Sequence, residues 1–206
     1  MKRFRFTLLA ICLVLIYLGW SDVDLYLRNQ TPLTIPLAEL ERQGAPREWL
    51  TIQEAYPDFV EAISTSGSVE VDAVLLPLKR SPEATEFRIV AETRDPKFLE
   101  LFRTYYFVLE TEQQRADFLA EHQAELVGPR EVTGVVVTGS VASGNRDKLL
   151  KLAKEVGLPV SNDVIFISAG KKIEAFRGFF FLGLALLALV KILSQWRQPA
   201  QAVETK

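Results

Sequence analysis

Two apolar segments, one near each end of the chain, constrain the fold more than any other feature of the sequence. The first, Phe6–Trp20, holds fifteen residues without a charge, and the second, Gly178–Val190, holds thirteen. Flanking residues extend both to the length that a bilayer-crossing helix needs. The 24 residues of Ile173–Trp196, for example, give a helix of about 36 Å. The sequence therefore predicts transmembrane helices at residues 1–21 and 173–196, a folded domain at residues 22–172 and a tail at residues 197–206.

Basic residues set the predicted orientation. Lys2, Arg3 and Arg5 precede the first apolar segment, and two aspartates follow it. The positive-inside rule then places the N-terminus in the cytoplasm, and two spans return the C-terminus to the same side. A cleaved signal peptide is the alternative, but the residues after Trp20 lack a small-x-small cleavage pattern. We expect a bacterial-type plasma (inner) membrane protein with cytoplasmic termini and an extracytoplasmic domain.

Cysteine content and charge exclude several classes of protein. The single cysteine, Cys12, lies within the first apolar segment. Neither a disulfide within the chain nor a cysteine-based redox or zinc site is therefore expected. The stretch Ser21–Arg177 carries 25 acidic side chains against 18 basic ones. Such an acidic domain lacks the basic patch of a nucleic-acid-binding protein, so nucleic acid is excluded as a partner.

The domain between the two segments reads as alternating strands and helices. Strand patterns, apolar and rich in β-branched residues, begin after Pro32 and recur at Glu48–Ala55, Val69–Leu78, Glu86–Thr93, Glu131–Val141 and Asp163–Ser168.

Helix signals lie between these strands. Asp95-Pro96 is a helix start, leading through Tyr105 to a break at the aromatic residues that follow. Thr111 and Gln114 fit a capping box before a helix at Arg115–Leu126. A third helix is expected at Arg146–Val156, capped by Asn145. The predicted fold class is a single α+β domain with a mixed sheet or a small, partly open barrel-like sheet.

Gly139–Gly144 has the glycine spacing of a phosphate-binding loop, between a predicted strand and a predicted helix. Asn145 and Arg146 stand where such a loop has the lysine and the hydroxyl residue that contact phosphate and magnesium. The segment is therefore predicted to be a tight turn, with anion binding at the helix N-terminus as the alternative.

The only histidine, His122, lies in a charged helical stretch, so neither a zinc site nor a serine–histidine–aspartate triad is expected. Asp117, Glu121 and Glu125 share one helical face and could hold a hard cation, although such a run is ordinarily a solvated face. No residue is assigned a catalytic, cofactor-binding or metal-binding role, and no cofactor is expected. A serine–lysine hydrolase stays open, because that dyad has no diagnostic spacing.

An aromatic-rich stripe follows the first predicted helix start, and it is predicted to belong to the core, with a hydrophobic docking surface as the alternative. Its members are Phe98, Leu101, Phe102, Tyr105, Tyr106 and Phe107.

The layout of an N-terminal span, an extracytoplasmic α+β domain and a C-terminal span resembles that of Surfeit-type oxidase assembly factors, without a shared motif. Small residues in the predicted spans would also let the two helices pack closely. They are Ala10, Gly19, Gly178, Gly183, Ala185 and Ala188.

The sequence favours a non-enzymatic, two-pass membrane protein that presents an interaction or assembly-factor domain. Its expected partners are the lipid bilayer and other membrane proteins. The alternatives are a membrane-bound hydrolase with a Ser/Lys or carboxylate site, and a ligand sensor that acts through a membrane partner.

Overall fold

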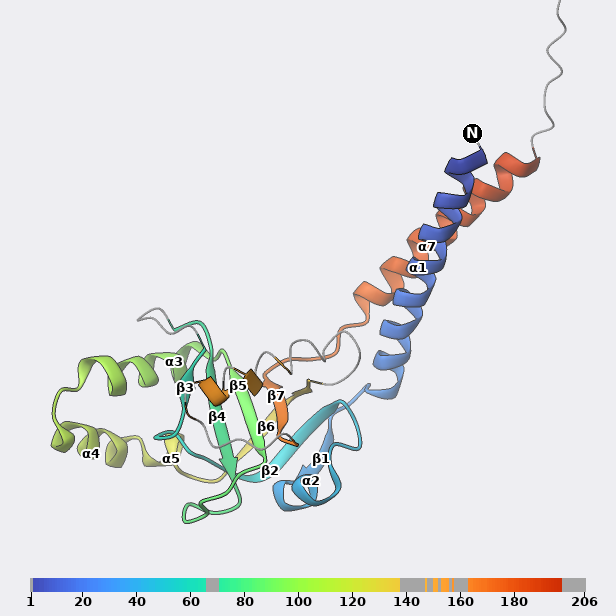
Figure 1. The fold of residues 1–206 in the computed structure, drawn as a ribbon. Helices are drawn as coiled ribbons and strands as arrows, with labels where there is room; N and C mark the ends of the chain where they lie inside the picture. Colours follow the sequence, from blue (N-terminus) through green and yellow to red (C-terminus); the bar gives the residue numbers. More distant parts are fainter. Residues whose placement is uncertain are drawn as a thin grey trace, which may run out of the picture. The chain divides into compact units, whose positions relative to one another are not determined.

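The chain forms two compact units in the computed structural model, which describes residues 2–65, 71–137, 147, 150–151, 153–155, 157 and 163–197. One unit combines Met1–Gln30 with Ile173–Lys206, and the other is Thr31–Lys172. The first is a pair of long helices, and the second is a strongly curved sheet with short helices (Figure 1). The predicted turn at Gly139–Gly144 and the predicted cap at Asn145 lie outside the described residues.

The first unit is an antiparallel hairpin of helix α1 (Lys2–Arg28) and helix α7 (Phe176–Arg197). Glycines let the two backbones approach closely: a Cβ at Gly19 would lie 3.0 Å from the carbonyl oxygen of Gly178, and one at Gly178 would lie 2.9 Å from the backbone nitrogen of Val23. Beside this contact, the Arg177 guanidinium donates two hydrogen bonds to the Asp22 carboxylate, at 2.6 and 2.7 Å. The predicted packing through Gly19 and Gly178 is confirmed.

The other small residues of the two helices differ in how closely the partner helix approaches them. Ala185 is buried, whereas Ala10 is exposed and a Cβ at Gly183 would meet no heavy atom within 4 Å. Of the predicted small residues, Gly19, Gly178 and Ala185 therefore lie in the contact between the helices, and Ala10 and Gly183 do not.

Both helices are long and apolar enough to cross a membrane, over Phe6–Arg28 and Phe176–Ser194, with mean hydropathies of 2.0 and 2.1. Helix α1 continues to Arg28, beyond the predicted boundary at residue 21, because no proline or glycine lies between Ser21 and Pro32. An i,i+4 ion pair at 3.1 Å between Asp24 and Arg28 supports this last part of the helix.

The second unit is built on seven strands in the order β1-β2-β6-β7-β5-β4-β3. Their bounds are β1 Leu33–Pro36, β2 Trp49–Pro57, β3 Ile63–Ser64, β4 Val74–Lys79, β5 Ile89–Thr93, β6 Arg130–Val136 and β7 Ile165–Ala169. An additional pairing of β2 with β4 closes β2, β6, β7, β5 and β4 into a five-stranded ring. The coarse prediction of an α+β, barrel-like domain is confirmed, and the sheet is closed where a partly open one was expected.

Strand β2 closes the ring by changing neighbours along its length. Its first half pairs with β1 on one side and β6 on the other. The register then shifts between Ile52 and Ala55, and beyond this bulge Tyr56 pairs with Lys79 of β4. Glu54 lies inside the bulge at φ 56°, a left-handed conformation that bends the strand.

The ring interior is the main hydrophobic core. Alternate residues of the strands point inward and are fully buried, among them Leu50, Ile52, Ile89 and Ile167. Gly134 of β6 lies where β6 closely approaches β7, since a Cβ there would come within 2.5 Å of the Ser168 carbonyl oxygen. Short helices add apolar side chains to this core from α2 (Leu37–Gln43), α3 (Pro96–Arg103) and α5 (Gln123–Leu126).

A smaller second core lies on the outer face of the ring. Leu75, Val90 and Phe166 alternate with the inward-facing residues and pack with Ala153. Both faces of β4 are therefore covered, which explains why all its residues are buried although the sequence there is partly alternating.

Helices α3, α4 (Glu112–Glu121) and α5 form an arm between β5 and β6 (Figure 1). Both predicted caps are confirmed: Asp95 accepts from the backbone N–H of Lys97, and Thr111 and Gln114 form a capping box. The predicted break occurs as a π-helical turn, η1 (Thr104–Val108). The predicted helix Arg115–Leu126 is interrupted at His122, which ends α4 and precedes α5.

Candidate interaction surface

An aromatic cluster joins the arm to the loop after β2. The Phe59 ring packs edge-on against the rings of Phe98, Phe102 and Tyr105, with centroid separations of 5.5, 6.2 and 5.3 Å. These four side chains are buried, so the stripe predicted as core is core for its first part. The end of the stripe behaves differently, because Phe107 is 49% exposed.

The π-helical turn η1 explains this division. The backbone N–H of Leu109 donates to the carbonyl of Thr104, five residues back, at 3.1 Å. A turn of this kind inserts one residue into the helix and displaces the side chains that follow it. Tyr105 thus remains buried and Tyr106 half-buried, whereas Phe107 and Val108 face outward.

Val60, Phe107 and Val108 form what we call the apolar patch. Their side chains are 54%, 49% and 66% exposed, and in the described part of residues 31–172 they are the large apolar side chains that stand exposed. The two segments are joined by the Tyr106 hydroxyl, which donates to the carbonyl of Val60 at 2.6 Å. Burial is the main cause that raises the pKa of Tyr106 to about 12, with Tyr105 and Asp58 adding and Arg115 opposing. Tyr106 is therefore a neutral donor at any physiological pH.

A buried ion pair fixes the loop that carries Val60. The Lys79 ammonium, whose side chain is 8% exposed, pairs with Asp58 and lies 3.7 Å from Glu61. The Asp58 carboxylate also accepts from the backbone N–H of Glu61 at 3.0 Å, and the Asp58 N–H donates to the carbonyl of Pro77 at 2.9 Å. The loop is thus tied to β4 at several points and holds Val60 in a defined position.

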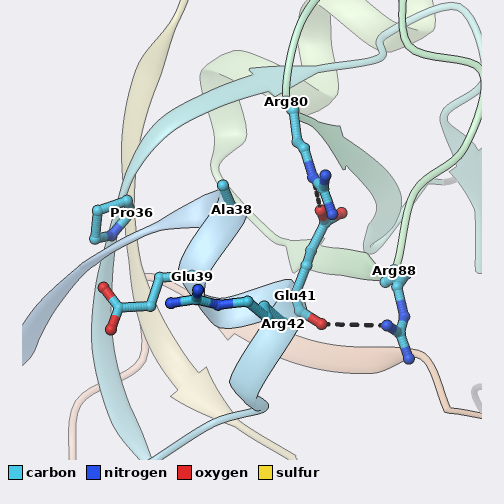
Figure 2. A pocket seen from close by; sticks show the side chains of 7 residues that line it. All are labelled: Pro36, Ala38, Glu39, Glu41, Arg42, Arg80 and Arg88. Atoms are coloured by element: carbon cyan, nitrogen blue, oxygen red, sulfur yellow. Dashed lines mark hydrogen bonds and ion pairs between the residues drawn. The ribbon is translucent and has the colours of Figure 1, made fainter.

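A second feature is an open depression of about 680 Å³ beside α2, shown in Figure 2. Glu41, whose side chain is 3% exposed, pairs there with Arg80, and its backbone carbonyl accepts from Arg88 at 3.2 Å. Arg88 also pairs with Asp163. The buried charge of Glu41 is therefore compensated by Arg80, and Arg80 and Arg88 fasten α2 to the β4–β5 connection. Arg42 and Glu39 complete the rim, along with Pro36 and Ala38.

The structure does not gather the acidic residues of the arm into a cation site. Asp117 accepts from Gln113 at 2.9 Å, while Glu125 accepts from Lys97 at 2.6 Å, a hydrogen bond that lowers the pKa of Glu125. The His122 ring packs against Phe118 with a centroid separation of 4.5 Å. Among the described residues, no cluster of three or more histidine, cysteine or acidic side chains could hold a metal ion.

The buried lysine of the domain does not form a serine–lysine dyad either. In the described ranges, the ion-pair partners of Lys79 are Asp58 and Glu61. A hydrolase with another arrangement stays a prediction.

Comparison with known proteins adds no identification. No protein-family model, no curated protein and no solved structure matches the chain. The resemblance in layout to Surfeit-type assembly factors stays a prediction.

Proposed function

We propose that this chain is a two-pass membrane protein that presents an interaction or assembly-factor domain outside the cytoplasm. The observation that carries the proposal is the apolar patch: Val60, Phe107 and Val108 are the large apolar side chains that stand exposed in the described part of the domain, and the Tyr106 hydroxyl links their two segments. A fixed cluster of exposed apolar side chains is typical of a surface that another protein covers.

The helical hairpin supports the membrane part of the proposal. Many of its apolar side chains face away from the partner helix; Phe6 is 73% exposed, Trp20 66% and Leu187 68%. Such surfaces are stable when lipid surrounds them. Because the two helices are antiparallel, Lys2, Arg3 and Arg5 share one end of the hairpin with Lys191, as expected for a cytoplasmic end.

The barrel supports interaction over catalysis. Fully buried apolar side chains such as Leu50 and Ile52 fill its interior. The charged clusters at Lys79 and Glu41 are engaged in ion pairs within the domain. The outer surface is thus the part of the domain that is available for function.

The test is extraction of the tagged full-length protein in a mild detergent, followed by native sizing and mass spectrometry of the material that co-purifies. We expect a stoichiometric partner with the wild type and its loss with the double variant Phe107→Ser, Val108→Ser. The matched control Arg42→Ala, at an exposed residue of the depression beside α2, should keep the partner. A wild-type protein that runs as a clean monomer or homo-oligomer would contradict the interaction function.

The orientation is tested separately with a membrane-impermeant maleimide on intact bacterial cells. Cys12 is fully buried, so a Gln113→Cys variant places one accessible thiol on the arm. Labelling of intact cells is expected. Labelling only after the cells are opened would place the domain in the cytoplasm.

A further inference from the structure

Charged residues close to both ends leave the two helices of the hairpin with short uncharged stretches. In α1, the stretch Phe6–Ser21 has 16 residues, which is about 24 Å of helix. In α7, the stretch Gly178–Val190 has 13 residues, which is about 20 Å of helix. The hydrocarbon layer of a typical bilayer is about 30 Å thick. Both stretches are therefore shorter than the layer that the hairpin is proposed to cross.

A bonded ion pair fixes one end of these stretches. The Arg177 guanidinium donates to the Asp22 carboxylate at 2.6 and 2.7 Å, and the Asp22 side chain is 16% exposed. The short aspartate cannot carry its charge to a more distant headgroup, and Arg177 is held on it. Removing even a paired charge from water is costly. The headgroup region is therefore expected to begin at the level of this pair.

Two amphipathic aromatic residues mark the same end independently of the charges. Tyr17 and Trp20 precede Asp22 in α1 by five and two residues, and their side chains are 70% and 66% exposed. Tyrosine and tryptophan rings that face lipid favour the boundary between the hydrocarbon and the headgroups. Their positions place this boundary no further along α1 than Asp22.

Lys191 sets the opposite end in α7. Its side chain is exposed, and its flexible stem could carry the ammonium group at most roughly 5 Å beyond the uncharged stretch. The Cα–Cβ bonds of an α-helix tilt toward its N-terminus, so Lys191 starts out in the direction opposite to the one required. The apolar length of α7 thus reaches about 25 Å at most, and any tilt of the hairpin shortens its span across the bilayer.

We infer that the hairpin is fitted to a thin bilayer, with a hydrocarbon layer of about 20–25 Å against the usual value of about 30 Å. This inference rests on the proposed membrane function and names the kind of bilayer. In a thicker bilayer, the surrounding lipid must thin or the charges at the ends of the hairpin must enter hydrocarbon, and both are unfavourable. Lipids with short acyl chains therefore bind around the hairpin in preference to longer ones.

The experiment measures which lipid contacts Trp20 in the full-length protein, reconstituted in phosphatidylcholine vesicles. Lipid with brominated eighteen-carbon chains quenches tryptophan fluorescence on contact, and it is mixed with unbrominated lipid whose chains have fourteen, eighteen or twenty-two carbons. The difference between the wild type and Trp20→Phe isolates the signal of Trp20, whose side chain is 66% exposed. We expect the fourteen-carbon lipid to compete about threefold more strongly than the eighteen-carbon lipid, and the twenty-two-carbon lipid to compete least.

Lys191→Leu tests whether the charged ends set this preference. The uncharged stretch of α7 then continues from Gly178 to Trp196, which is 19 residues or about 28 Å. We expect the advantage of the fourteen-carbon lipid to disappear. Ser194→Leu is the matched control, because it adds the same side chain at an exposed position of the same helix and leaves Lys191 in place. This control should keep the preference of the wild type.

The outcomes distinguish failure of the inference from failure of the proposed function. Protein that separates from the vesicles in flotation after an alkaline wash contradicts the two spans, and the inference fails with them. Protein that stays in the vesicles but binds the longer lipids as strongly as the fourteen-carbon lipid overturns the inference alone. An unchanged preference in Lys191→Leu also overturns it, because the charged ends would then not set the match.

Discussion

The two units of the chain place their apolar side chains in opposite ways. In the hairpin, Leu186 and Leu187 are 63% and 68% exposed. In the barrel, Leu50 and Ile52 are fully buried. The same residue types therefore face outward in the hairpin and inward in the barrel domain, as expected if the proposed surroundings are lipid for the hairpin and water for the barrel domain.

The apolar patch is an exception to this contrast between the two units. Val60, Phe107 and Val108 follow the arrangement of the hairpin although they belong to the barrel domain. They are held there by ordered contacts, including the hydrogen bond from Tyr106 to the Val60 carbonyl. The exposed position of the patch is thus fixed by the fold of the domain.

The largest expected effect is in the barrel domain, at its buried charge. Lys79→Met leaves the carboxylate of Asp58 buried without its counter-ion, which should lower the free energy of unfolding by about 3 kcal/mol. Chemical denaturation of the full-length protein in micelles, followed by tryptophan fluorescence, measures it.

The double variant Lys79→Met, Asp58→Asn is the matched control. It should recover part of the loss, because the asparagine oxygen can still accept from the Glu61 N–H. Additive losses would show that the two charges are not coupled.

Gly134→Ala tests the tight packing of the ring. A Cβ at this position would meet the Ser168 carbonyl oxygen at 2.5 Å and Ile167 Cγ2 at 2.7 Å, so β6 and β7 must separate. We expect a loss of about 2–3 kcal/mol in the same denaturation experiment. Thr133→Ala, at the neighbouring residue that faces outward, should lower the free energy of unfolding by less. Equal losses in the two variants would show that the close contact of Gly134 with β7 is not important for stability.

Gly178→Ala makes the corresponding test in the hairpin. The new methyl group would lie 2.9 Å from the Asp22 Cβ and the Val23 backbone nitrogen. Cys12 is fully buried, so its rate of alkylation by a maleimide in micelles reports how often the helices part. We expect about a tenfold faster reaction, equal to about 1.4 kcal/mol, and no change in the control Gly183→Ala. An unchanged rate in both would show that the glycine contact does not hold the hairpin.

Tyr106→Phe should have the smallest effect, a loss of about 1 kcal/mol from the missing hydrogen bond to Val60. The folded state holds the Tyr106 proton more tightly than the unfolded state, because its pKa is about 12 against an ordinary 10.0. The contribution of Tyr106 to the free energy of unfolding is therefore complete below pH 10 and is lost as the pH rises from 10 to 12. The melting temperature should fall more steeply between pH 10 and 12 for the wild type than for the variant. Parallel curves would mean that Tyr106 ionises equally in both states.

Features set by local chemistry could be predicted from the sequence. The long uncharged segments identify the two apolar helices, and the side chains of Asp95 and Thr111 cap the helices that follow them. Each predicted strand region contains a strand, because β-branched runs between turn residues are a local signal. The short helix α2 and the two-residue strand β3 were missed, since neither is long enough to show a period.

The closure of the ring and the apolar patch could not be predicted. Closure depends on the bulge in β2, where Glu54 adopts a left-handed conformation that a glutamate in a strand pattern does not signal. The patch depends on one inserted residue in η1, which decides whether Phe107 faces inward or outward. The available signal was the apolar run Tyr105–Leu109, which is longer than one face of an α-helix can bury.

The position of β7 in the ring has a consequence for biosynthesis. This strand lies between β5 and β6, both of which precede it in the chain, and it is the last strand to be made. Until Ile165–Ala169 leaves the ribosome, β5 and β6 each keep an edge without its neighbour, and such edges bind other strands. The sheet therefore stays incompletely paired until nearly the whole domain has been synthesised. Protection of the nascent chain from aggregation matters more for this protein than for one whose strands pair in sequence order.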